Sequence, residues 1–138
     1  MKVWEKYGSL KRKEIISDIF KVIQDKIDFK IPDDYQEYLI NYTGFENHIG
    51  TEYVVIWDLV ELMEFNTDYE VFELMQNGLG IGSNGSSEMI VLKRIDNNKF
   101  KILLIPYLDL DEEDTYIEIG DSFLDLFYRL ESNKRWFK

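Results

Sequence analysis

The sequence contains no cysteine and only one histidine, His48. Without cysteine, a disulfide scaffold, a thiolate metal site and a cysteine nucleophile are all excluded. A single histidine excludes metal sites that need a histidine pair, and it disfavours a catalytic triad centred on histidine. We expect His48, beside Asn47, to lie in a surface loop.

Long hydrophobic runs are also missing. Residues 1–13 are polar and charged, and they lack the apolar core of a signal peptide. No window approaches the roughly 20 apolar residues that a membrane-spanning helix needs. The sequence therefore predicts a cytoplasmic protein.

Positive charge is scarce and unevenly distributed. The chain has 27 acidic and 16 basic residues, which gives a net charge of -11. Residues 31–92 carry twelve acidic residues and no lysine or arginine, and residues 106–128 carry eight acidic residues and no base. The three segments that flank and separate these blocks each carry a net charge of +3. This balance argues against nucleic acid or an anionic membrane as a partner, and it suits either a basic partner or solubility alone.

With 138 residues, of which 45% are hydrophobic, the chain is expected to fold as one domain over residues 1–138. Helical periodicity predicts a helix over residues 11–27 and a second helix that starts at Pro32. Asp58 is expected to cap a short third helix, and residues 68–75 add another helical turn or two. Residues 122–130 predict a terminal amphipathic helix.

Runs of β-branched and aromatic residues predict strands at residues 53–57, 88–95, 100–105 and 116–119. The Asp-Asn-Asn-Lys tetrapeptide between the second and third of these runs is typical of a hairpin turn. The glycine-rich residues 78–85 are expected to be irregular. The order of elements predicts an α+β fold, a single domain with a mainly antiparallel sheet packed with helices from both ends of the chain.

Residues 80–85 spell the G-x-G-x-x-G pattern of dinucleotide-binding proteins. That fingerprint needs a helix directly after it, whose amide groups and dipole face the pyrophosphate. Here a strand is expected instead, and Glu88 would repel a phosphate. The alternative is a tight turn whose glycines adopt positive φ angles, and this interpretation is preferred.

Asp109, Asp111 and Glu113 have the 1, 3, 5 spacing of a calcium-binding loop. The pattern then fails, because position 6 is Asp114 instead of glycine and position 12 is Gly120 instead of glutamate. No pair of carboxylates stands in an apolar setting that would raise one pKa for acid catalysis. The residues therefore predict no catalytic group, no metal and no cofactor.

Four segments, in this order, resemble the SUKH superfamily, also called the Smi–Knr family. Residues 31–39 are similar to its "LPxDYxxFL" helix, and residues 57–62 with Asn66 to its "W…L.EL…N" segment. Residues 80–88 are similar to its "IGSNGGGE" turn, with two serines in place of glycines, and residues 119–127 to its closing "IAxSFxxFL" helix. The resemblance implies a non-enzymatic α+β domain in which the glycine turn is structural.

Many bacterial members of that family are immunity proteins that neutralise a cognate nuclease or deaminase toxin, and fungal relatives regulate cell-wall glucan synthesis. The leading hypothesis is therefore an immunity protein that binds a basic toxin domain, and the alternative is a regulatory or scaffolding protein. The expected partner-binding residues are all acidic: Asp58, Glu61, Glu64, Asp109, Asp111, Glu112, Glu113 and Asp114. Asp58 presents a conflict, because one carboxylate cannot both cap a helix and contact a partner freely.

Overall fold

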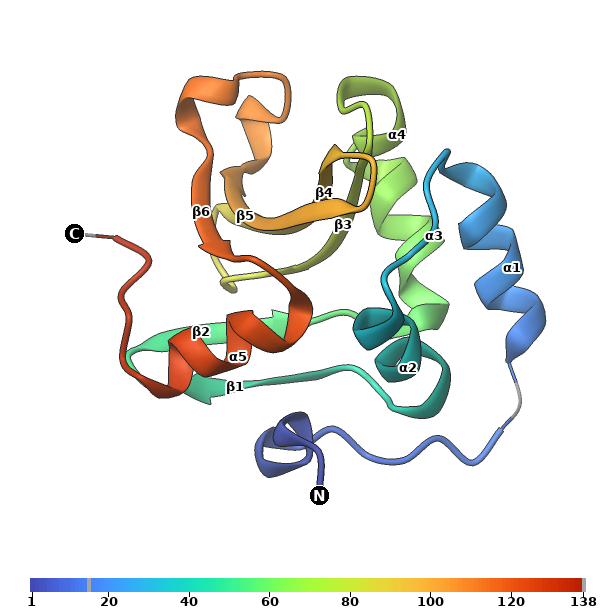
Figure 1. Ribbon diagram of the computed structural model, residues 1–138, viewed down its shortest axis with the longest axis vertical. Helices are drawn as coiled ribbons and strands as arrows, with labels where there is room; N and C mark the ends of the chain where they lie inside the picture. Colours follow the sequence, from blue (N-terminus) through green and yellow to red (C-terminus); the bar gives the residue numbers. More distant parts are fainter. Residues whose placement is uncertain (15, 138) are drawn as a thin grey trace.

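Within residues 1–14 and 16–137, which the structure describes, six strands form one antiparallel sheet in the order of the sequence. The computed structural model is drawn in Figure 1. The strands are β1 (Phe45–Ile49), β2 (Glu52–Ile56), β3 (Gly78–Ser83), β4 (Glu88–Asp96), β5 (Lys99–Pro106) and β6 (Ile117–Gly120). The predicted hairpin is the β4–β5 pair.

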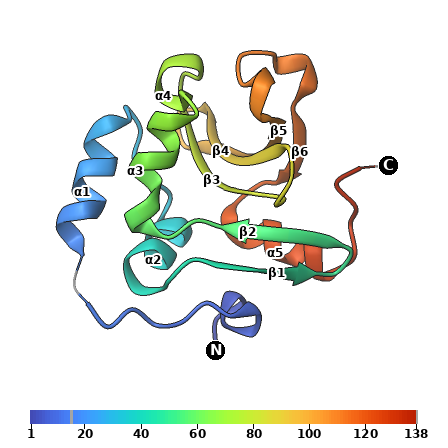
Figure 2. The same ribbon diagram turned by 180° about the vertical axis from the view of Figure 1, so that it is seen from behind.

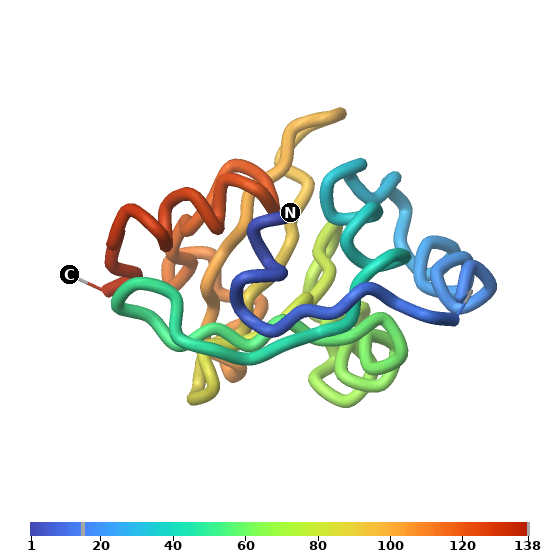
Figure 3. The backbone as a smooth tube through the Cα atoms, turned by 90° about the horizontal axis from the view of Figure 1, so that it is seen from below, coloured from blue at the N-terminus to red at the C-terminus, as the bar shows by residue number. Residues whose placement is uncertain are grey.

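The helices are α1 (Ser17–Lys26), α2 (Asp33–Asn41), α3 (Leu59–Asp68), α4 (Val71–Leu74) and α5 (Phe123–Glu131). Short 3₁₀ helices cover Val3–Tyr7, Tyr107–Asp109 and Glu113–Thr115. Figure 1 shows α5 lying across β1 and β2, and Figure 3 shows α5 and α1 at opposite ends of the molecule with the sheet between them. The predicted α+β fold, with helices from both ends of the chain against an antiparallel sheet, is confirmed.

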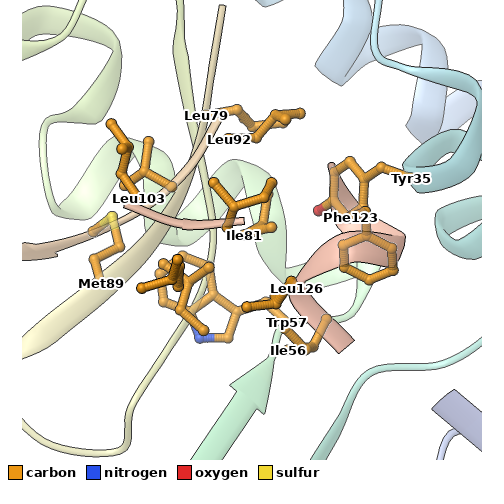
Figure 4. Close-up of a cluster of buried hydrophobic side chains, with 14 of the residues drawn as sticks. Tyr35, Ile56, Trp57, Leu79, Ile81, Met89, Leu92, Leu103, Phe123 and Leu126 are labelled. Atoms are coloured by element: carbon orange, nitrogen blue, oxygen red, sulfur yellow. The ribbon is translucent and has the colours of Figure 1, made fainter. Parts of the chain in front are cut away.

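An aromatic cluster joins the N-terminal and C-terminal helices. The Trp4 ring lies 5.2 Å from that of Tyr38 and 5.7 Å from that of Phe123, and Phe123 lies 5.0 Å from Tyr35. All four side chains are buried. Figure 4 shows how Ile81 from the sheet and Tyr35 from α2 approach Phe123 on α5. Offset and edge-to-face aromatic packing of this kind stabilises a core beyond the area that it buries.

The expectation that residues 78–85 are irregular was wrong, because Gly78–Ser83 form the fully buried strand β3. A Cβ atom on Gly80 would lie 2.8 Å from Met89 Sδ and 3.2 Å from the Trp57 ring, and one on Gly82 would lie 2.1 Å from the Val55 carbonyl oxygen. The glycines therefore allow a close approach of neighbouring groups within the sheet. The motif that resembles a phosphate loop is largely a strand.

Two further expectations need correction. Residues 45–49 form strand β1, so His48 lies exposed on an edge strand and not in a loop. The first helix begins at Ser17, whereas residues 9–13 run extended along the end of α2, and the predicted position Ile15 lies outside the described residues. The extended path is fixed by hydrogen bonds, because Ser9 Oγ donates to the Thr43 carbonyl at 2.6 Å.

None of the helices in residues 1–14 and 16–137 is long and apolar enough to cross a membrane.

Candidate functional site

Asp58 connects three parts of the chain at the start of α3. Its carboxylate caps the helix by accepting from the Val60 amide, and it also accepts from the Gly44 amide at 2.9 Å. The Arg12 guanidinium lies 3.0 Å away, and the Arg12 side chain is only 9% exposed. The conflict over Asp58 is thereby resolved, because its carboxylate is engaged within the fold.

Glu61 completes the cap of the same helix. Its side chain accepts from the Asp58 amide at 3.0 Å, which makes the Asp58–Glu61 pair a reciprocal capping box. This bond uses Oε1 of the Glu61 carboxylate. Glu61 is half-buried, whereas Glu64, one turn further along α3, is exposed.

Asn66 holds α3 against the sheet. Its side-chain oxygen accepts from the Gly80 amide at 2.7 Å, and its nitrogen donates to the Gly80 and Leu62 carbonyls, each at 2.9 Å. Asn66 is fully buried. A buried polar side chain must be satisfied in this way, since an unpaired group costs about 1–3 kcal/mol.

The β3–β4 turn is closed by its own side chains. Asn84 accepts from the amides of Ser86 and Glu88, and it donates to the Glu88 carboxylate at 2.7 Å. The expected tight turn is therefore confined to the residues after Ser83. Only Gly85 of the three glycines in residues 80–85 has a positive φ angle, whereas Gly80 and Gly82 lie in strand β3.

A row of aromatic rings connects α3 with the loop between β5 and β6. The Trp57 ring lies 4.6 Å from Phe65, Phe65 lies 6.2 Å from Tyr69, and Tyr69 lies 4.6 Å from Tyr107. Trp57 is buried, Tyr107 is half-buried and Tyr69 is 41% exposed. Burial raises the pKa of Tyr107. The row thus reaches the surface where the acidic loop begins.

The acidic loop, residues 107–116, is anchored at its middle. Leu110 is buried, and its carbonyl accepts a hydrogen bond from the Tyr116 hydroxyl. Leu108, in contrast, is 95% exposed. Asp109 is half-buried, whereas the predicted contacts Asp111, Glu112, Glu113 and Asp114 are exposed.

The acidic residues of the segment 106–128 fall into two groups that differ in their ion pairs. Glu118, Asp121 and Asp125 are paired with Lys101 or Arg129, and the Lys101 hydrogen bond lowers the pKa of Asp121. The loop carboxylates have no such partner within the described part of the chain, and neither do those of α3 and α4 after Asp58. We call these unpaired groups the acidic surface: Glu61, Glu64, Asp68, Glu70, Glu73, Asp109, Asp111, Glu112, Glu113 and Asp114.

The Tyr69–Tyr107 contact brings the two predicted acidic regions together. Figure 1 shows α4 and the β5–β6 loop at the same upper end of the molecule, above the far end of α3. Glu61 lies at the opposite end of α3, about 12 Å along the helix axis from Tyr69. The acidic surface is therefore elongated, with Glu61 at one end and the loop at the other.

A groove opens beside Glu61. It has a volume of about 480 Å³, and strands β1 and β2 and helix α3 form its walls. Its lining residues are Thr43, Gly44, Phe45, Glu46, Val55, Ile56, Trp57, Asp58, Glu61 and Phe65. Within residues 1–14 and 16–137, no group of three or more metal-binding side chains is placed to hold a metal ion.

The comparison with known families decides the relationship. The model of the SMI1/KNR4 family (SUKH-1) matches residues 16–129. The chain belongs to the SMI1/KNR4 family. This match confirms the resemblance seen in the sequence, and it spans all four of the family-like segments. No curated protein matches the chain.

Membership of the SMI1/KNR4 family bears on the kind of role that this site has. The family consists generally of non-enzymatic immunity or regulatory proteins, so the match supports a role of one of these two kinds. The family-like residues Trp57, Asp58, Asn66 and Gly80 gather around α3, where they fix the helix on the sheet.

Sequence reasoning missed several residues of this region. Glu46 lies on the unexpected strand β1, and the sequence patterns assigned no role to Phe65, Tyr69 or Tyr107. The one available signal was the spacing of Glu61, Phe65 and Tyr69, which recur every four residues and so share one face of α3.

Proposed function

We propose that the protein is an immunity protein that binds a basic toxin domain and neutralises it without catalysis. The observation that carries the proposal is the acidic surface, whose carboxylates lack ion-pair partners within the described residues. Unpaired charges of one sign repel one another, and a partner of opposite sign relieves that repulsion. A surface of this kind is suited to a cationic protein.

A toxin that acts on nucleic acid supplies the required charge. Nucleases and nucleic-acid deaminases need lysine and arginine near the active site to hold phosphates. An acidic protein is steered towards such a site and covers it, which blocks the substrate without any chemical step. The proposal places this encounter in the cytoplasm of the cell that makes both proteins.

The acidic surface also offers apolar contacts. Tyr69 and Leu108 are both exposed, and they lie next to the acidic residues Asp68, Glu70 and Asp109 in the sequence. Tyrosine is enriched among residues that dominate binding energy, and surrounding polar groups exclude water from such contacts. Tyr69 is therefore proposed as an anchor and the carboxylates as its charged surroundings.

The test is protection of cells. The proposal predicts that the neighbouring gene encodes a toxin domain, and that co-expression of this protein restores growth of cells that produce the toxin. A variant with Asp111, Glu112, Glu113 and Asp114 all changed to lysine should protect poorly although it folds. Full toxicity in the presence of the wild-type protein would contradict the proposal and favour the regulatory alternative.

A further inference from the structure

The groove beside Glu61 has a lining suited to one kind of side chain. Its floor is apolar and aromatic, formed by Val55, Trp57 and the half-buried ring of Phe65. The charged residues among its described lining are all acidic: Glu46, Asp58 and Glu61. Figure 2 shows the strands β1 and β2 and the helix α3 that form the groove. An occupant therefore needs an apolar stem and a positive end.

Two of these carboxylates are held in place by the fold. Oε2 of Glu46 accepts from the Tyr53 hydroxyl at 2.5 Å, and Oε1 of Glu61 accepts from the Asp58 amide at 3.0 Å. Each of these bonds uses one oxygen of its carboxylate. A side chain that is already ordered loses less conformational entropy when a ligand binds. This favours the half-buried Glu61 as an acceptor, whereas the exposed Glu46 is held by the Tyr53 bond alone.

The third carboxylate already binds a guanidinium group. Arg12 donates from Nη2 to Asp58 at 3.0 Å, and also to the Tyr42 carbonyl at 2.7 Å. Asp58 is therefore engaged, and Glu46 and Glu61 are the acidic residues that remain for a ligand. The contact of Arg12 shows that this end of α3 accommodates a guanidinium beside a carboxylate.

We infer that the groove receives an arginine side chain of the partner protein, with Glu61 and Glu46 as its acceptors and Phe65 against its apolar part. Arginine fits better than lysine, because a planar guanidinium stacks on an aromatic ring and donates in a fixed fork to carboxylates. The methylene stem covers the apolar floor. This inference rests on the proposed function, since it assigns one contact of the toxin.

The inference is tested with a small probe, so that the toxin is not needed. Nα-acetyl-arginine amide is titrated into the full-length ¹⁵N-labelled protein, and amide chemical shifts are followed. We expect saturable shifts at Glu46, Glu61 and Phe65, with a dissociation constant of ~1 mM, the scale for a ligand of this size. Nα-acetyl-lysine amide should bind at least about threefold more weakly.

Glu61→Gln is the decisive variant, because glutamine keeps the capping box and removes the charge. It should weaken binding of the arginine probe about fivefold or more, since a charge-assisted hydrogen bond is lost. Asp18→Asn is the matched control, because it also removes one exposed negative charge but lies on α1, outside the groove and outside the acidic surface, and it should change binding less than about twofold.

Three results would overturn the inference: shifts that do not saturate, shifts confined to residues 107–116, or equal binding by wild type and Glu61→Gln. If the groove fails to bind the probe while the protein still protects cells from the toxin, the proposed function stands and only the arginine site is lost. If the probe binds as expected but no protection occurs, the proposed function fails instead.

Discussion

Asp58→Ala is expected to lower the free energy of unfolding by about 4 kcal/mol, the scale for breaking a buried ion pair from one side. The Asp58 side chain is 19% exposed and Arg12 is 9% exposed, so the substitution leaves the Arg12 charge shielded from water without a carboxylate. The Gly44 and Val60 amides lose their acceptor in the same step. Urea denaturation at pH 7 measures the change.

Two variants separate the causes of that loss. Asp58→Asn keeps an acceptor at the cap and removes the charge. Its free energy of unfolding should therefore lie between those of the wild type and Asp58→Ala. Asp68→Ala, at the exposed end of the same helix, should change the free energy of unfolding by less than about 0.5 kcal/mol. A loss below about 1 kcal/mol in Asp58→Ala would show that Arg12 finds other partners or is solvated.

Charge reversal of the acidic loop is expected to have the largest effect on binding. Changing Asp111, Glu112, Glu113 and Asp114 to lysine should weaken the affinity for the toxin domain about 100-fold or more at low salt, because like charges then face each other across the interface. Isothermal titration calorimetry measures this loss. The four side chains are exposed, so the urea midpoint should change little.

The matched control changes the net charge equally on and near α1, outside the acidic loop. Glu14, Asp18, Asp25 and Asp28 are exposed and lie on or near α1, and their change to lysine should weaken binding less than about tenfold, through long-range charge alone. Equal losses in the two variants would mean that net charge matters and that the loop has no special role.

The sequence predicted most of the elements, because periodicity and capping residues are local signals. Asp58 caps α3, as its position before an apolar run indicated, and the helix predicted from residues 122–130 is α5, capped by Ser122. Strand β3 was not recognised, since its glycines are typical of turns in isolation and their packing against Trp57 and Val55 depends on distant residues. Strand β1 was missed because the edge sequence Phe-Glu-Asn-His-Ile exposes its three central residues.

The candidate site was only partly predictable for the same reason. Glu61, Glu64 and the loop carboxylates could be chosen from local charge, but the contact between Tyr69 and Tyr107 joins residues far apart in the sequence. Charge counting also could not distinguish Asp109–Asp114 from Glu118, Asp121 and Asp125. Their difference comes from Lys101 and Arg129, which the fold brings to the latter group.

The most direct test of electrostatic neutralisation is the association rate constant with the toxin domain as a function of salt, measured by stopped flow. Steering between oppositely charged surfaces is screened by ions, so the rate constant should fall at least about tenfold between 20 mM and 500 mM sodium chloride. If the acidic surface causes this steering, the association rate constant of the variant with four lysines in the acidic loop should depend less on salt. A wild-type rate constant that stays within about twofold over this range would contradict the account.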